Sequence, residues 1–140
     1  MIISFAALAL IHSFASIAPV PQPTELPAKT GCLDWQGTAS GNDPSVVVRL
    51  QVCGDGTQVR GTFQWSSQRS GWNRRSVEGT RGTAGFTLRD TALIEDRPAD
   101  GWRFCLIDSY QLTASGDELV GTYDSAACAD HATLTLRRTR

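Results

Sequence analysis

The sequence predicts an all-β fold, an eight-stranded antiparallel up-and-down meander barrel that carries two disulfides. Three observations lead to this prediction. Short segments alternate apolar and polar residues, the connections between them alternate between tight and long, and four cysteines are spaced to match two hairpins. Downstream of residue 33 no helical period is sustained.

The first eighteen residues carry no charged side chain and form an apolar core from Ile2 to Ile11, interrupted only by Ser4. This core is shorter than the ~20 apolar residues that a membrane-spanning helix needs, and small residues follow it around Ala15 and Ala18. Its uniform apolarity, without period 2 or 3.6, argues against a buried element of the domain. We therefore expect residues 1–18 to be a signal peptide, leaving a secreted or periplasmic protein with no membrane span.

Residues 19–31 contain four of the six prolines, a composition that favours an extended polyproline II tether over sheet. Residues 32–140 then remain for the β-barrel domain, which is enough for one core and too few for two. With 13 basic and 14 acidic residues the chain is nearly neutral. The basic footprint of a nucleic-acid-binding protein is missing, so we expect no nucleic-acid partner.

Eight alternating segments separated by Gly, Asn and Asp predict the strands. They are Asp34 to Ser40, Val46 to Cys53, Gln58 to Ser66, Asn73 to Thr80, Ala84 to Asp90, Trp102 to Thr113, Leu119 to Asp124 and Ala132 to Arg138. Their apolar positions share one face, which we expect to be buried, and their polar positions face solvent. Inside these segments glycine precedes threonine at Gly37, Gly61, Gly79 and Gly121, where bends would let the sheet curl and close.

The connections predict a barrel with two different ends. Tight turns are expected at Asp55-Gly56, Arg81-Gly82-Thr83 and Ser115-Gly116-Asp117, and longer loops at Gly41 to Ser45, Ser67 to Trp72, Thr91 to Gly101 and Ser125 to His131. Alternate connections of a meander lie at opposite ends. All the long loops should therefore gather at one end of the barrel, which we call the long-loop end.

Four cysteines in an exported chain of this size imply two disulfides, for which three pairings exist. Residues that face each other across an antiparallel hairpin lie at equal distances from its turn. Cys32 and Cys53 are nearly equidistant from a turn near residue 43, as are Cys105 and Cys128 from one near residue 116. We therefore expect Cys32 to pair with Cys53 and Cys105 with Cys128. Zinc binding is the competing use, but Cys-x-x-Cys spacing is missing and one histidine survives signal removal.

The strand number and meander order, together with Gly121-Thr122-Tyr123-Asp124-Ser125, resemble the calycin-type barrels, the avidins and lipocalins. The five-residue stretch is similar to the Gly-Thr-Tyr-x-Ser of avidin-like strands. The resemblance implies the architecture alone. The tryptophan segments of an avidin pocket have no counterpart, and Asp34-Trp35-Gln36-Gly37 does not reproduce the lipocalin Gly-x-Trp opening, so no binding residue is carried over.

Candidate ligand-binding residues lie at the long-loop end. The segment from Ser66 to Ser76 holds Trp72, Asn73, Arg74 and Arg75. Aromatic faces stack on sugars or apolar ligands, and arginine pairs with carboxylates. The alternative is an ordinary hairpin loop whose tryptophan packs on the barrel rim. Glu95, in the acidic loop that follows, would either join the site or form surface ion pairs with these arginines, worth about 0–1 kcal/mol.

Asp108 interrupts the inward series of the segment 102–113 and is the sixth candidate site residue. A carboxylate in the core has to be paired, protonated or functional; a bulge at Asp108-Ser109 that turns the side chain outward is the simpler interpretation. His131 adjoins Asp130, but neighbours in an extended segment point to opposite faces and do not form a dyad. We expect no catalytic residue, cofactor or metal site.

The leading functional prediction is an exported binding module that takes a small ligand or glycan at the long-loop end. It requires a hollow interior, whereas the inward aromatic residues are bulky enough to fill a small barrel. The alternative is a solid barrel that acts on a protein partner through its surface loops, as an inhibitor or an envelope interaction domain. A hydrolase or isomerase that uses Asp108 or His131 ranks below both.

Overall fold

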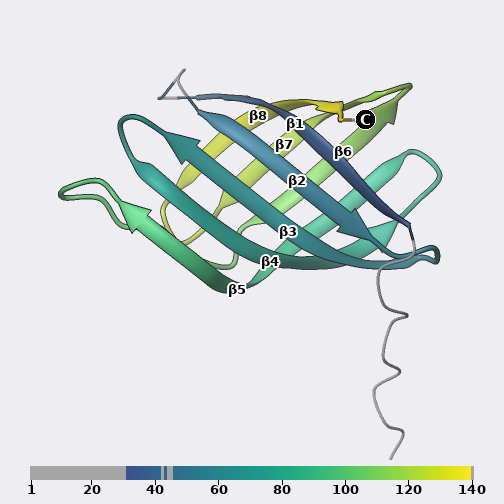
Figure 1. Cartoon of the computed structure of the whole chain (residues 1–140), viewed down its shortest axis with the longest axis horizontal. Coiled ribbons are helices and arrows are strands. Elements are labelled where there is room, and N and C mark those ends of the chain that lie inside the picture. Colours follow the sequence, from purple (N-terminus) through teal and green to yellow (C-terminus); the bar gives the residue numbers. More distant parts are fainter. Residues whose placement is uncertain (1–30, 42, 44–45, 140) are drawn as a thin grey trace, which may run out of the picture.

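The computed structural model describes residues 31–41, 43 and 46–139. The predicted signal peptide and all but the last residue of the predicted tether lie outside them. Eight strands form one closed antiparallel barrel in chain order, which confirms the predicted fold class (Figure 1). They are β1 (Cys32–Ser40), β2 (Val47–Cys53), β3 (Gln58–Ser67), β4 (Gly71–Arg81), β5 (Gly85–Pro98), β6 (Ser109–Ser115), β7 (Glu118–Ser125) and β8 (Asp130–Arg138). The described part of the chain contains no helix that could cross a membrane.

Pairing between the first and last strands closes the barrel, with register from Trp35 opposite Arg138 to Ser40 opposite Thr133. Closure gives every strand a neighbour on both sides, so no strand lies at the edge of the sheet. Both predicted disulfides are present. Cys32 lies directly opposite Cys53 in the β1–β2 ladder; we call this bond the first disulfide. The second disulfide, Cys105–Cys128, joins the connection before β6 to the connection after β7.

Alternate connections lie at opposite ends of the barrel, as the sequence predicts, although not every connection predicted to be long is long. The tight connections after β2, β4 and β6 lie together at one end, on the right in Figure 1, and the connections after β1, β3, β5 and β7 lie at the other. Of the latter, residues 99–108 form the longest connection among those that are fully described.

The half of the barrel next to the tight turns has a solid core. Trp35 contacts Phe86 edge to face, with ring centroids 5.5 Å apart, and leucine and valine side chains of all eight strands fill the surrounding space. The strands approach closely at the predicted bends. A Cβ added at Gly121 would lie 1.8 Å from the carbonyl oxygen of Gln111, and one at Gly61 would lie 1.7 Å from that of Gln51. Only glycine fits these crossings.

The region from β5 to β6 departs from the prediction. Most of the predicted loop from Thr91 to Gly101 belongs to β5, and the predicted strand from Trp102 begins only at Ser109. Two register shifts in the β4–β5 ladder break the alternation that marks a strand in sequence. Since β6 pairs only with Gly85–Arg89, the rest of β5 forms its strand ladder with β4 alone. Trp102, predicted to face inward, is 43 % exposed.

The predicted loop from Ser67 to Trp72 is also shorter than expected. β3 continues to Ser67 and β4 begins at Gly71, so that residues 68–70 make the connection. Gly71 has φ of +92°, and an added Cβ would lie 2.3 Å from the carbonyl oxygen of Arg97. This glycine allows the chain to turn directly into β4, which places Trp72 and Asn73 within a strand.

Candidate functional site

A cavity of about 390 Å³ lies at the long-loop end, inside the barrel. Its volume falls in the range of small-molecule sites, roughly 300–1,000 Å³. Inward side chains of the surrounding strands and the residues of the second disulfide form its walls, among them Ala39, Trp65, Asn73, Arg75, Phe104, Tyr123 and Ala132. The interior is therefore filled near the tight turns and hollow near the long loops.

Aromatic rings connect the cavity wall to the solid core. Trp65 and Tyr123 both line the cavity, with ring centroids 5.1 Å apart. Tyr123 in turn lies 5.8 Å from Tyr110, which stacks on Phe63 at 4.4 Å. Trp65 remains partly exposed. Because its neighbours hold the ring, it offers a rigid flat surface against which an apolar ring could stack.

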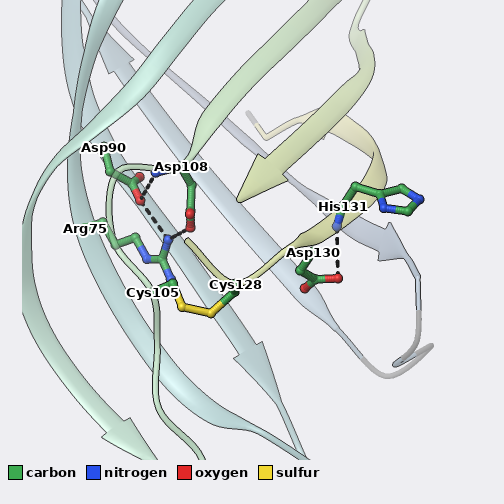
Figure 2. The surroundings of a disulfide bond; sticks show 7 residues. All are labelled: Arg75, Asp90, Cys105, Asp108, Cys128, Asp130 and His131. Carbon is green, nitrogen blue, oxygen red and sulfur yellow. Dashed lines mark hydrogen bonds and ion pairs between the residues drawn. A yellow bond between two sulfur atoms is a disulfide. The ribbon is translucent and has the colours of Figure 1, made fainter. Parts of the chain in front are cut away.

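Figure 2 shows a buried ion cluster made of Arg75, Asp90 and Asp108. Of the three residues, Arg75 lines the cavity. Arg75 Nη1 is 2.7 Å from Asp90 Oδ2 and also donates to Asp108 Oδ2. The hydroxyl of Tyr110 donates to Asp90 Oδ1 at 2.8 Å, and Arg75 Nε donates to Asn73 Oδ1 at 2.8 Å. The three side chains of the ion cluster are at most 5 % exposed.

The burial of these groups changes their protonation equilibria. Burial lowers the pKa of Arg75, but Tyr110, Asp90 and Asp108 together raise it by more, so the guanidinium stays charged. Burial raises the pKa of Asp90 above its ordinary value, although the charge of Arg75 opposes the change. Burial also raises the pKa of Tyr110, and the charge of Asp90 adds to this. The ion cluster has formal charge −1 with both carboxylates ionised and 0 with Asp90 protonated.

One hydrogen-bond donor at the inner end of the cavity has no partner among the described residues. Asn73 is fully buried and lines the cavity; its Oδ1 accepts from Arg75, and this contact fixes the orientation of the amide. Its Nδ2 makes no hydrogen bond. Leaving such a donor buried and unpaired costs about 1–3 kcal/mol, so native proteins rarely retain one without a use for it.

The outer wall of the cavity is an irregular segment, residues 99–108, which no strand pairs with along most of its length. The second disulfide attaches its middle to the β7–β8 connection, and both cysteines line the cavity. Its end is fixed where the backbone N–H of Asp90 donates to the carbonyl of Asp108 at 2.9 Å. Ile107, just before this anchor, has φ of +67°. The second disulfide therefore holds one wall of the cavity.

Charged residues of both signs surround the mouth of the cavity. The guanidinium of Arg69 lies 5.6 Å from the ring centroid of Trp102, and Asp43, Arg103 and Asp130 also line the opening. The carboxylate of Asp130 accepts from the backbone N–H of His131, whose imidazole points away from it in Figure 2. This contact orders the chain and does not activate the imidazole.

The structure divides the six predicted site residues into two groups. Asn73, Arg75 and Asp108 are buried inside the barrel, and of these Asn73 and Arg75 line the cavity. Trp72, Arg74 and Glu95 are only half-buried or exposed. Arg74 Nη2 is 3.8 Å from Glu95 Oε2 with both side chains more than 40 % exposed, the surface pair that the sequence also suggested. The assignment of ligand contacts to the inner group stays a prediction.

The interpretation of Asp108 is wrong in one respect. The sequence favours a bulge that turns this side chain outward, whereas Asp108 is fully buried. The positive φ of Ile107 redirects the chain just before β6, so the carboxylate enters the barrel and meets Arg75. A buried arginine on another strand gives no signal in the sequence around Asp108.

The sequence also did not identify Trp65, Tyr123 and Arg103 as cavity residues. Trp65 was expected to face inward, as one of the aromatic residues bulky enough to fill a small barrel. Both residues lie on β3, but Trp65 is farther than Phe63 from the tight turn at the start of the strand. The solid core ends at the level of Phe63 and the cavity begins beyond it, so the position along the strand was the signal that distinguished the two residues.

The described residues contain no group of three or more His, Cys, Asp or Glu side chains placed to hold a metal ion. Comparison with protein-family models, with curated proteins and with solved structures gives no match to this chain.

Proposed function

We propose that this protein is a binding module that takes a small ligand into the cavity at the long-loop end. The observation that carries the proposal is the polar inner end of the cavity, where a fully buried amide beside the aromatic wall keeps an unpaired donor. A filled core would bury apolar groups at these positions. Small-molecule sites are usually preformed cavities of this size in which a few polar groups are placed to orient the ligand.

Two features agree with an exported carrier of the calycin type. The closed meander of eight strands has the architecture of avidins and lipocalins, whose ligands enter at one end of the barrel. The two disulfides suit an oxidising compartment, as expected if residues 1–18 direct export to the periplasm or the exterior. The tether of residues 19–31 would then separate the barrel from the cleavage site.

The test is a small-molecule screen by thermal shift and tryptophan fluorescence, repeated on a variant whose cavity is filled. Ala132→Phe places a ring in the cavity, and Thr133→Phe places the same ring on the exposed face of the same strand. Ligands found with the natural protein should bind at least tenfold more weakly to A132F and unchanged to T133F. Equal binding to both variants, or a screen without a ligand, would contradict the proposal.

One observation favours the second candidate function, binding to a protein partner. Four of the exposed large apolar side chains fall in a single stretch of the chain: Ile94, Trp102, Leu106 and Ile107, the last 76 % exposed. Exposed apolar groups gathered in this way often mark protein contacts. If this function is correct, Ile107→Ser should weaken partner binding and A132F should not, which is the reverse of the pattern expected for a ligand in the cavity.

A further inference from the structure

We propose that the ligand is an uncharged ring compound that points a carbonyl oxygen, from an amide, lactam or ketone, at Asn73. The inference rests on the proposed function and specifies the ligand class of the same cavity. Three properties of the cavity lead to it: its charge, its unpaired donor and its aromatic wall.

The charge of the cavity disfavours an ionised ligand. Arg75 is the only cation at the inner end among the described residues, and it is already paired with two carboxylates. Bringing a carboxylate of the ligand there would place a third negative charge beside Asp90 and Asp108 in a region shielded from water. Asp90 and Asp108 do not line the cavity, so an ammonium group would meet the guanidinium of Arg75 and the unpaired amide donor of Asn73. A buried charge without a partner is costly in either case.

The polar group that fits the inner end is a hydrogen-bond acceptor. Asn73 Nδ2 is an unpaired donor, and the Oδ1 of the same amide is already occupied by Arg75 Nε. The other polar side chain lining the inner end, Arg75, is also donor-only. Asp108 Oδ1, beside Arg75, is a buried acceptor without a partner among the described residues, but Asp108 does not line the cavity. A carbonyl oxygen brings lone pairs alone, which match the donors of Asn73 and Arg75 that do line it.

The ring follows from the wall above Asn73. Trp65 lies directly opposite Asn73 in the β3–β4 ladder, and Tyr123 lies beside Trp65 on the cavity wall. A group bonded to Asn73 Nδ2 therefore extends outward past two aromatic faces. At about 390 Å³ the cavity has room for one or two fused rings, which would stack on Trp65 while the carbonyl reaches the amide.

The experiment compares three probes of nearly the same shape: benzamide, benzoate and benzylamine, which is a cation at neutral pH. Binding is followed at pH 7 by NMR on the ¹⁵N-labelled full chain, with the Asn73 side-chain amide and the Trp65 indole N–H as reporters. We expect benzamide to shift both signals with a Kd at least tenfold lower than that of either charged probe. Methyl glucoside, an uncharged ring with hydroxyls in place of the carbonyl, should also bind more weakly than benzamide.

A matched pair of variants checks the contact with Asn73. Asn73→Leu keeps the size of the side chain and removes the donor, so benzamide should bind roughly three- to tenfold more weakly. Arg49→Gln, on the exposed face of β2, should leave binding unchanged. Because Asn73 also accepts from Arg75, N73L could fail to fold; the comparison of the three probes on the natural protein does not depend on this variant.

Each result bears on one of the two proposals. Equal or tighter binding of benzoate, benzylamine or methyl glucoside at the two reporters overturns the ligand class and leaves the cavity as a binding site. The class is also overturned if none of the probes moves the reporters at millimolar concentration while ligands from the screen do. If the screen fails as well, the proposed function falls with it.

Discussion

Replacing Arg75 with methionine tests whether the buried ion cluster holds the barrel together. Methionine keeps most of the side-chain volume and removes the charge, leaving two carboxylates inside the barrel without a counter-charge. Arg75 Nη1 lies 2.7 Å from Asp90 Oδ2, with the two side chains only 5 % and 1 % exposed. Asp108, which also accepts from this nitrogen, is fully buried.

The size of the effect follows from these distances. Unit charges 2.7 Å apart interact by about 6 kcal/mol at an effective dielectric constant of ~20. Each buried ion also costs several kcal/mol in lost hydration, so the net effect of removing one partner is about 3–5 kcal/mol. We expect R75M to lose about 4 kcal/mol of the free energy of unfolding at pH 7. Adding Asp108→Asn should recover roughly 2 kcal/mol, since one stranded carboxylate is then removed.

The effect should depend on pH in a known direction. Burial raises the pKa of Asp90 in the folded protein, so the folded state binds this proton more tightly than the unfolded chain does. Stability from Asp90 is then complete below its unfolded pKa of about 3.8 and falls as pH rises through the folded value. Without Arg75 the pKa of Asp90 rises further. The deficit of R75M should therefore be greatest at neutral pH and shrink as pH falls towards 4.

Urea unfolding followed by circular dichroism from pH 4 to pH 8, with both disulfides intact, measures these differences. The control is Arg89→Met, which breaks the exposed Arg89–Glu78 pair (2.6 Å, 67 % and 49 % exposed) and should cost less than about 1 kcal/mol. Losses of equal size in R75M and R89M would refute the argument from burial. A deficit that grows as pH falls would refute the assignment of the carboxylates as the source.

Three further predictions concern the barrel itself. Gly121→Ala should cost roughly 2–3 kcal/mol in urea unfolding, because its Cβ would lie 1.8 Å from a backbone oxygen of the next strand; Gly56→Ala, with nothing within 4 Å, should be neutral. Burial raises the pKa of Tyr110 and Tyr123, so their contribution to stability is complete below pH 10 and falls above it. Absorbance at 295 nm, which reports ionised tyrosine, should therefore rise only together with unfolding. A tyrosine that titrates near pH 10 in the intact barrel would contradict this prediction. Replacing either disulfide with two alanines should cost about 3 kcal/mol, since the loops span 21 and 23 residues, but only Cys105→Ala/Cys128→Ala should change the NMR signals of the cavity wall.

The sequence predicted the barrel well because its strands obey a local rule. Alternation of apolar and polar residues with period two identifies a strand that is solvent-exposed on one face, and most segments of this chain show this alternation. The first disulfide was predictable for the same reason: Cys32 and Cys53 face each other in an unbroken ladder. The rule failed at Thr91 and Ile94, the extra residues of two bulges, where the chain stays in the sheet but the alternation is lost.

The site could be predicted only in part because its residues depend on one another across strands. Asn73 and Arg75 were identified as polar residues near the long-loop end, and Asp108 as an anomaly in an inward series. Asp108 and Arg75 form an ion pair because the barrel places β4 and the start of β6 on the two sides of β5. Periodicity describes one strand at a time and cannot show such a pairing.

The buried ion cluster also resolves the conflict between a solid and a hollow barrel. An eight-stranded barrel is just wide enough for its side chains to fill, so a cavity persists only where something prevents collapse. Here the inward residues change from leucine and valine near the tight turns to Asn73, Arg75, Asp90 and Asp108 towards the other end. Because hydrogen bonds among these groups hold them in place, they cannot move into the cavity at the long-loop end. If R75M/D108N remains folded, the aromatic wall should lose this support, and the cavity should shrink and release its ligand.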